Sequence, residues 1–220
     1  IRIDGAGKKV TRSDNCRVSD LSVSSDNLTF TYEAKSLPYP IDTSYYDNEK
    51  HTQADALSVI PFMDEMNYEG LSVSGLSDGY YGLTIGGEFI GRFTARELER
   101  GINMALLQNT PQYKQAMKIR QMNEERWLKE RKMREFYWVE YNLMRKTGML
   151  WACDEAAVDT LRKYRPHDIF LQWNGDLWLQ YMHKGIREDC VNEQQDLVDR
   201  IYEQNKPIPL QIEIKKFTDL

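Results

Sequence analysis

The sequence predicts an α+β protein, in which an antiparallel β-sandwich-like domain carries a helical insertion with one long helix. Three observations support this fold class. Short alternating segments separated by polar and glycine turns fill residues 1–93, a helical pattern begins at Thr94, and alternation returns near the C-terminus. A chain of 220 residues can bury a sizeable core. We therefore expect a β-domain from residues 1–93 with 207–220, and a helical insertion from 94–206.

The strand predictions depend on apolar and polar side chains that alternate along the chain. In "CRVSDLSVSSDNLTFTYEA", Leu28, Phe30 and Tyr32 alternate with polar residues after a polar turn. The stretches "LSVSGL" from Leu71 and "YYGLTI" from Tyr80 show the same period of two. Short strands joined by Ser, Asn, Asp and Gly turns are typical of an antiparallel sandwich.

The stretch "LTIGGEFIGRFTARELERG" contains four glycines, and the adjacent pair Gly86-Gly87 could belong to a phosphate loop or to a turn. A phosphate loop places its glycines between a strand and a helix N-terminus. Here Gly86-Gly87 is followed by "EFIGRF", which alternates as a second strand does. A Gly-Gly pair between alternating runs favours a hairpin turn with positive φ. We predict a hairpin here and no anion site.

Two capping signals mark the start of the helical part. Thr94 and Glu97 have the spacing of a capping box, so a helix should run from there to about Gln108. Thr110 then precedes Pro111, which costs nothing in a first helical turn because its missing N–H would be unpaired there.

The second of these helices is predicted to be long. Its pattern continues to about Lys146, and Gly148 follows as a C-terminal stop signal. Further helices are expected over residues 154–165 and 189–205. The closing stretch "PIPLQIEIKKF" alternates again, and we predict that it pairs in the same β-domain as the strands before Thr94, because a lone strand leaves its backbone groups unpaired.

The stretch "IFLQWNGDLWLQYM" is compatible with two structures. It could be a hairpin that turns at Asn174-Gly175, or a kinked helix with Phe170, Trp173, Leu177 and Tyr181 on one face. We favour the helix.

Composition restricts the class of function. The net charge of -5 disfavours a nucleic-acid binder, and the charged run "NEERWLKERKMRE" mixes both signs at i,i+4 spacing, as a solvated helix face does. No run of about 18 apolar residues is present that could span a membrane. Cys16, Cys153 and Cys190 lie far apart and form no CxxC pair, which disfavours a zinc cluster and allows at most one disulfide.

The sequence offers no catalytic constellation. His51, His167 and His183 are widely separated, no HExxH motif occurs, and no serine is framed by glycines as a nucleophile would be. We expect structural or surface roles for the histidines, with no metal and no cofactor. An enzyme built around His167 and Asp168 has no supporting spacing.

The aromatic residues could serve either packing or ligand binding. Trp173, Trp178 and Tyr181 have helical spacing, which favours a core position over a sugar-stacking platform. An alternative function is a carbohydrate-binding or protein-interaction module. Its candidate ligand contacts are four aromatic residues: Tyr39, Tyr45, Tyr46 and Trp173.

Several stretches form one ordered series, namely "VSDLSVSSDNLTFTYEAKSLPYPID", "MNYEGLSVSGLSDGYYGLTIGGEFIGRFTARELERGINMALLQNTPQYKQA" and "KPIPLQIEI". Together they resemble the region that follows the catalytic domain in SGNH/GDSL-type hydrolases. The resemblance covers most of the chain and is weakest from about residue 148 to 189. The matching positions are Leu37, Pro38, Pro40, Val73, Gly75, Leu76, Gly79, Tyr80 or Tyr81, Leu83, Ile85, Gly87, Gly101, Asn103, Thr110, Pro111, Gln115 and Ala116.

The catalytic motifs of those hydrolases are missing from this chain. Gly175-Asp176 is followed by Leu177 instead of serine, and no histidine has an aspartate three residues before it. The resemblance therefore implies a non-catalytic C-terminal accessory domain, with the catalytic SGNH domain upstream in the same polypeptide. It also implies a parent enzyme outside the cytoplasm that hydrolyses esters, with acylated carbohydrate as a candidate substrate.

Overall fold

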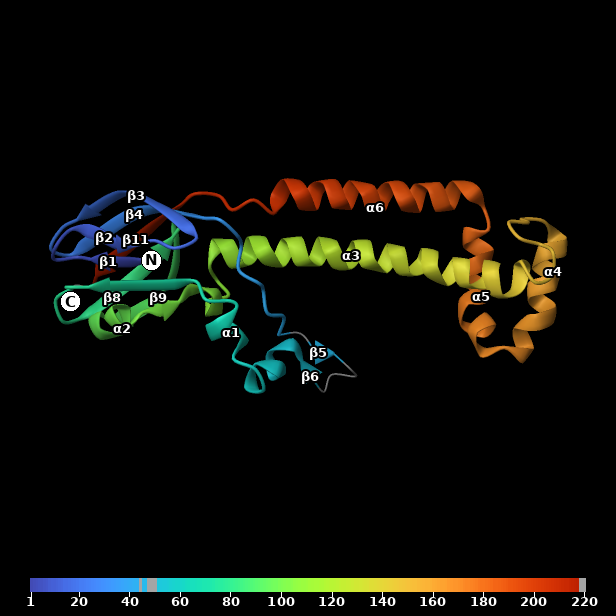
Figure 1. Cartoon of the computed structure of the whole chain (residues 1–220), viewed down its shortest axis with the longest axis horizontal. Coiled ribbons are helices and arrows are strands. Elements are labelled where there is room, and N and C mark those ends of the chain that lie inside the picture. Colours follow the sequence, from blue (N-terminus) through green and yellow to red (C-terminus); the bar gives the residue numbers. More distant parts are fainter. Residues whose placement is uncertain (44, 47–50, 218–220) are drawn as a thin grey trace. The chain divides into compact units, whose positions relative to one another are not determined.

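The computed structural model describes residues 1–43, 45–46 and 51–217, and for Tyr45 and Tyr46 it describes only the backbone. The chain forms two compact units (Figure 1). The first, here called the β unit, comprises Ile1–Arg120 with Gln204–Leu220. The second, here called the helical unit, comprises Gln121–Glu203.

The β unit contains the strands that the structure describes. In chain order they are β1 (Arg2–Asp4), β2 (Lys9–Arg12), β3 (Cys16–Val23), β4 (Asn27–Ala34), β5 (Tyr45–Tyr46), β6 (His51–Thr52), β7 (Gly70–Ser74), β8 (Tyr80–Ile85), β9 (Glu88–Thr94), β10 (Ile102–Asn103) and β11 (Leu210–Lys216). One sheet has the order β10-β7-β1-β2, a second has the order β3-β4-β11-β8-β9, and β5 pairs with β6.

The C-terminal strand completes the larger sheet. β11 lies between β4 and β8, antiparallel to both, with Ile212 opposite Phe30 on one side and Ile85 on the other. All three of these side chains are buried. The prediction that the last strand pairs in the same β-domain as the early strands is therefore confirmed.

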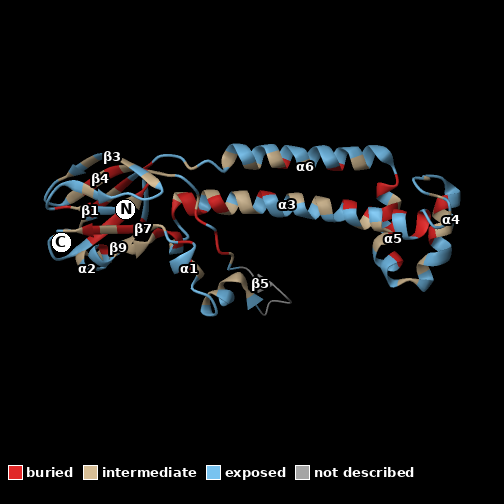
Figure 2. Ribbon diagram, in the orientation of Figure 1, coloured by how far each residue is buried: buried red, intermediate tan, exposed pale blue. Residues whose placement is uncertain are grey.

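The core of the β unit takes side chains from both larger sheets. Ile3 and Val73 come from the smaller sheet, and Leu28, Leu83 and Ile214 come from the larger one. Figure 2 shows buried residues in red along the strands of this unit. Among the strand pairs in the described residues, pairing is antiparallel except between β1 and β7, which are parallel. The α+β class with a sandwich-like β part is confirmed.

The Gly86-Gly87 hairpin is confirmed. The two glycines join β8 to β9 and have φ values of 59° and 83°. Positive φ is unfavourable for residues with a Cβ, so glycine is suited to both positions. The Gly86 N–H donates to the carbonyl of Gln211, 2.8 Å away, and so ties the turn to the neighbouring strand.

Short helices occupy the β unit between its strands. They are η1 (Gln53–Ser58), α1 (Phe62–Glu65), α2 (Ala95–Arg100) and η2 (Met104–Leu106). The capping box at the start of α2 is present, with the Thr94 hydroxyl accepting from the Glu97 N–H and the Glu97 carboxylate accepting from the Thr94 N–H.

The prediction that this helix continues to about Gln108 is wrong. Gly101, with φ of 97°, ends α2, and β10 then pairs with β7. The sequence pattern is compatible with a longer helix. However, β10 pairs with β7, about thirty residues earlier in the chain, and this pairing prevails over the local helix propensity.

The long helix α3 (Pro111–Val139) begins where the sequence indicates. The Thr110 hydroxyl accepts from the Tyr113 N–H in its first turn. A π-helical turn, η3 (Glu140–Met144), follows, and Gly148 with φ of 78° ends the run. The other helices described are α4 (Glu155–Tyr164), η4 (Arg165–His167), α5 (Ile169–Tyr181) and α6 (Lys184–Gln204).

These helices confirm most of the predicted pattern of the helical part. Asp154 caps α4, as the range 154–165 predicts. α6 begins five residues before the predicted start at 189, because the helix tolerates Gly185 in its first turn. The charged run on α3 forms i,i+4 ion pairs, such as Arg131 with Glu135, which confirms a solvated face.

α5 confirms the helix and only part of its predicted face. Tyr181 is buried and Leu177 is partly buried in the core of the helical unit, together with Leu171 and Trp178. Phe170 and Trp173, predicted on the same face, are exposed. A helix that is apolar on several sides cannot be oriented from periodicity, because packing decides which stripe is covered.

Of the helices in the described part of the chain, none combines the length and apolar character that crossing a bilayer requires. All three cysteines are free thiols.

Candidate functional site: a polar cleft in the β unit

The aromatic residues singled out by the sequence are not described as one group. Tyr39 belongs to the β unit, is exposed, and accepts a hydrogen bond on its hydroxyl from the Gln53 amide. Trp173 belongs to the helical unit and is also exposed. The side chains of Tyr45 and Tyr46 lie outside what the structure describes. A ligand role for these residues stays a prediction.

The three histidines are exposed and belong to two different units. His51, His167 and His183 are all exposed, on β6, on η4 and just before α6. Within the described residues, no group of three or more His, Cys, Asp or Glu side chains is placed to hold a metal ion.

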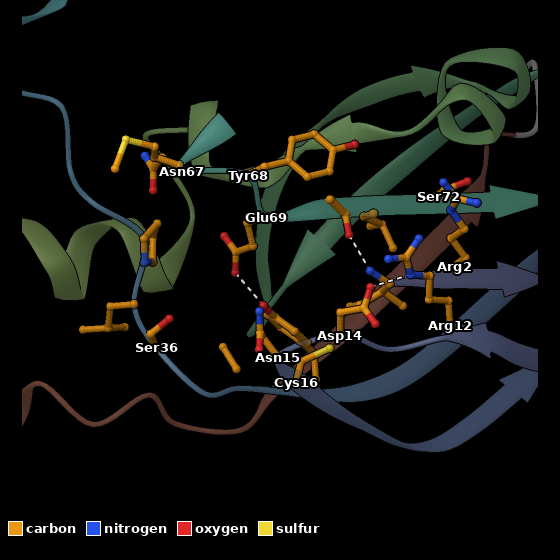
Figure 3. A pocket seen from close by; sticks show the side chains of 18 of the residues that line it. Arg2, Arg12, Asp14, Asn15, Cys16, Ser36, Asn67, Tyr68, Glu69 and Ser72 are labelled. Atoms are coloured by element: carbon orange, nitrogen blue, oxygen red, sulfur yellow. Dashed lines mark hydrogen bonds and ion pairs between the residues drawn. The ribbon is translucent and has the colours of Figure 1, made fainter. Parts of the chain in front are cut away.

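A cleft of about 430 Å³ lies in the β unit, and sequence reasoning did not find it. It is lined from several segments: by Arg2 and Arg12 on β1 and β2, by residues 14–16, by Tyr32 on β4, by 36–38, and by 66–72 (Figure 3). Strands, turns and the segment before β7 all contribute to its wall. Its lining is mainly polar, with arginine, aspartate, asparagine and glutamate side chains.

Glu69 is one of two acidic side chains that line this cleft, and the other, Asp14, is paired with Arg12. Its Oε1 accepts a hydrogen bond from the Tyr32 hydroxyl at 2.8 Å, drawn as a dashed line in Figure 3. The Gln112 Nε2 on α3 lies 3.3 Å from Glu69 Oε2 and 3.4 Å from Oε1. The backbone of Glu69 is also fixed, because its N–H donates to Asn103 Oδ1 and its carbonyl accepts from Met104 N–H.

Burial sets the ionisation of this group. Loss of hydration raises the pKa of Glu69, and the hydrogen bonds from Tyr32 and Gln112 only partly oppose that rise. Burial and the neighbouring Glu69 raise the pKa of Tyr32, so its hydroxyl stays protonated and donates. The Gln112 Oε1 is buried and has no hydrogen-bond partner in the described residues.

The rest of the cleft argues for binding and against covalent chemistry. Burial raises the pKa of the Cys16 thiol, so the nucleophilic thiolate is disfavoured at neutral pH. Arg12 is paired with Asp14. Carboxylate, hydroxyl and guanidinium groups together can hold a polar ligand or a polar protein surface.

Two polar residues that contribute to the family resemblance, Asn103 and Gln115, have structural roles. Asn103 on β10 uses its amide to hold the segment before β7, donating to the carbonyls of Met63 and Asn67. Gln115 on α3 donates to the carbonyls of Gln204 and Lys206, at the start of the return to β11. These polar residues hold segments together that are distant in sequence.

The Gly175-Asp176 pair, which is followed by Leu177 where a nucleophile motif has serine, lies inside a helix. Gly175 and Asp176 lie in the middle of α5, where Gly175 is packed against Arg165. Both Asp176 carboxylate oxygens accept from Arg165 at 2.7 Å. This aspartate therefore has a structural partner.

The protein is therefore of the α+β class, with a helical unit and a sandwich-like β unit that contains a polar cleft. Comparison with known proteins agrees with this division. The family model of the diltiazem deacetylase C-terminal helical domain matches residues 117–206, which nearly coincide with the helical unit Gln121–Glu203. No curated protein matches the chain.

One solved structure is similar along nearly the whole chain. It is described as a gut microbial diltiazem-metabolizing enzyme, with a TM-score of 0.91 and 35% sequence identity. The match covers 98% of this chain and 49% of that one. The chain thus spans about half the length of that enzyme.

Proposed function

We propose that this chain is the non-catalytic C-terminal accessory part of an ester hydrolase. The observation that carries the proposal is the match of nearly the whole chain to about half of a diltiazem-metabolizing enzyme. The family model that matches residues 117–206 bears the name of a deacetylase, and removal of an acetyl group from an ester is a hydrolysis. The proposal assigns this reaction to another domain of the same polypeptide.

The finer assignment is to the SGNH/GDSL type, outside the cytoplasm, with acylated carbohydrate as a candidate substrate. It is supported by the ordered series from Leu37 to Ala116, in which Asn103 and Gln115 have the structural contacts described above. Acyl transfer by a serine needs a nucleophile, a base and an oxyanion site together. In the proposal, the domain upstream supplies all three.

The test compares the chain alone with the polypeptide that includes the coding region preceding Ile1. Hydrolysis of p-nitrophenyl acetate is measured with and without a serine-directed organophosphate. We expect hydrolysis that the reagent abolishes in the longer polypeptide, and no reagent-sensitive hydrolysis by residues 1–220, whose folding is checked by circular dichroism. Reagent-sensitive turnover by residues 1–220 alone, or a longer polypeptide without hydrolase activity, contradicts the proposal.

A further inference from the structure

Four large apolar side chains are exposed on one short segment of the β unit. Val59, Ile60, Met66 and Tyr68 have exposed fractions of 82%, 53%, 78% and 58%. They lie on both sides of α1, which Figure 2 shows largely in the exposed colour. Scattered exposed apolar residues are normal, but a concentration of this kind marks an interaction surface. We call these four residues the α1 face.

The α1 face is supported from beneath by a small apolar cluster. Met63 on α1 is buried against Ile41 and Ala105. Phe62 packs edge-to-face on Tyr39, with ring centroids 5.6 Å apart. The segment therefore buries apolar side chains on its inner side and still presents others outward.

A buried amide, that of Asn67, and a half-buried one, that of Asn103, fix the backbone of this segment. The Asn67 side chain accepts from the Tyr39 N–H and donates to the Tyr39 carbonyl, both at 2.9 Å. The Asn103 amide donates to the carbonyls of Met63 at 2.9 Å and Asn67 at 3.1 Å. A segment fixed in this way loses little conformational entropy when a partner binds.

The α1 face adjoins the cleft. Met66 and Tyr68 line it, and so do Glu69 and Ile1. Figure 3 labels Tyr68 and Glu69 in its wall. A partner seated on the α1 face therefore also covers polar groups of the cleft. Such a surface, apolar beside polar, has the composition of a protein interface with a hydrophobic centre and a polar rim.

The comparison with the solved enzyme indicates which partner covers this face. That enzyme has about as much chain outside the match as within it. We propose that the α1 face is the docking surface for the catalytic domain of the same polypeptide, and that docking closes the Glu69 cleft. This inference rests on the proposed function. The aromatic cluster of Tyr137, Tyr141 and Trp151 in the helical unit is a weaker candidate, because those rings already contact one another edge-to-face.

Hydrogen exchange measured by mass spectrometry tests the docking surface. Amide exchange is compared between residues 1–220 alone and the longer polypeptide. We expect peptides from 57–70 to exchange at least about tenfold more slowly in the longer polypeptide, while peptides from 184–204 exchange equally in both. Equal exchange at 57–70, or protection confined to 137–151, overturns the proposal. Protection at 57–70 that appears in residues 1–220 alone as its concentration rises indicates a second copy of the chain and also overturns it.

A double variant sharpens the test. Val59→Asp with Met66→Asp places charges on the α1 face, and we expect exchange at 57–70 in the longer polypeptide to return to the rate of the chain alone. Val191→Asp, at an exposed position on α6, is the matched control and should keep the protection. Unchanged protection in the double variant contradicts the proposal. The outcome is independent of the esterase assay, so hydrolysis without protection rejects only the docking surface, and protection without hydrolysis rejects only the hydrolase assignment.

Discussion

Each compact unit encloses a glutamate, and the two carboxylates have different surroundings. In the helical unit, Glu140 is fully buried and accepts from the Trp178 indole N–H at 2.7 Å and the Trp151 backbone N–H at 2.9 Å. In the β unit, Glu69 is half-buried in the wall of a cleft and accepts from the Tyr32 hydroxyl at 2.8 Å, with the Gln112 Nε2 at the longer distance of 3.3 Å. A carboxylate between two fixed N–H donors stabilises the fold, whereas one beside a rotatable hydroxyl and a cleft can also meet a ligand.

Positive φ occurs in both units, and one case involves the buried glutamate. In the β unit, Gly86 and Gly87 have positive φ, and so do the non-glycine residues Lys8, Asn15 and Asp20. In the helical unit, Gly148 has φ of 78° and Trp151 has φ of 64°, in a region that disfavours bulky side chains. The hydrogen bond from the Trp151 N–H to Glu140 holds this residue. The buried Glu140 carboxylate therefore stabilises an unfavourable backbone conformation in the helical unit.

The largest expected effect concerns the core around Glu140. Trp178→Ala should lower the free energy of unfolding of the helical unit by about 3–5 kcal/mol, because it leaves a cavity and removes a donor to Glu140. Urea denaturation followed by circular dichroism at 222 nm measures this. Trp173→Ala on the same helix is the control, and should stay within about 0.5 kcal/mol because its side chain is 66% exposed. Equal losses in the two variants contradict the assignment of the buried face.

A smaller effect is expected from Glu140→Gln. Each oxygen of Glu140 accepts from an N–H that cannot turn into an acceptor, so the new amide must place N–H against N–H on one side. Such an unpaired contact costs about 1–3 kcal/mol. The same denaturation experiment measures it. Glu69→Gln is the comparison and should cost less, because the Tyr32 hydroxyl can rotate and accept. A larger loss of stability for Glu69→Gln than for Glu140→Gln at pH 7 would contradict this expectation.

A substitution at Gly87 in the β8–β9 hairpin should destabilise the fold through backbone strain alone. Gly87→Val should destabilise by about 1–2 kcal/mol, because a β-branched residue is disfavoured at positive φ. A Cβ at Gly87 would meet no atom within 4 Å, so steric contact adds nothing. Gly87→Asn is the control and should cost less, since asparagine tolerates this region. Thermal unfolding of both variants provides the measurement, and an equal loss would contradict the prediction, because β-branching would then add nothing.

The smallest effect is a pH dependence at Glu69. Because the folded pKa of Glu69 is raised, the folded state binds more protons than the unfolded state between about 4.3, the ordinary pKa, and the raised value. Stability contributed at this site is therefore lost as the pH rises through that window. Glu69→Gln cannot titrate, so the variant should gain stability relative to the native chain from pH 4 to pH 7. A difference between the two chains that stays constant with pH would contradict the raised pKa.

Features that depend on neighbouring residues were predictable from the sequence. The Gly86-Gly87 turn, the Thr94–Glu97 capping box and the Pro111 helix start all follow from backbone geometry within a few residues. The alternation of β11 predicted its place in the β part for the same reason, since its period of two defines a face to be covered.

The tertiary structure alone decided which distant segments meet. Glu69 and Tyr32 are 37 residues apart, and Gln112 is 43 residues further along the chain than Glu69, so no local pattern announces the cleft. The end of α2 at Gly101 and the buried face of α5 likewise depend on partners elsewhere in the chain. The sequence by itself determined where turns, caps and alternating strands lie, because those depend on steric limits and hydrogen bonds among adjacent residues. Packing decided the cleft and the covered faces, because burial stabilises a side chain only through contact with residues whose distance in sequence is arbitrary.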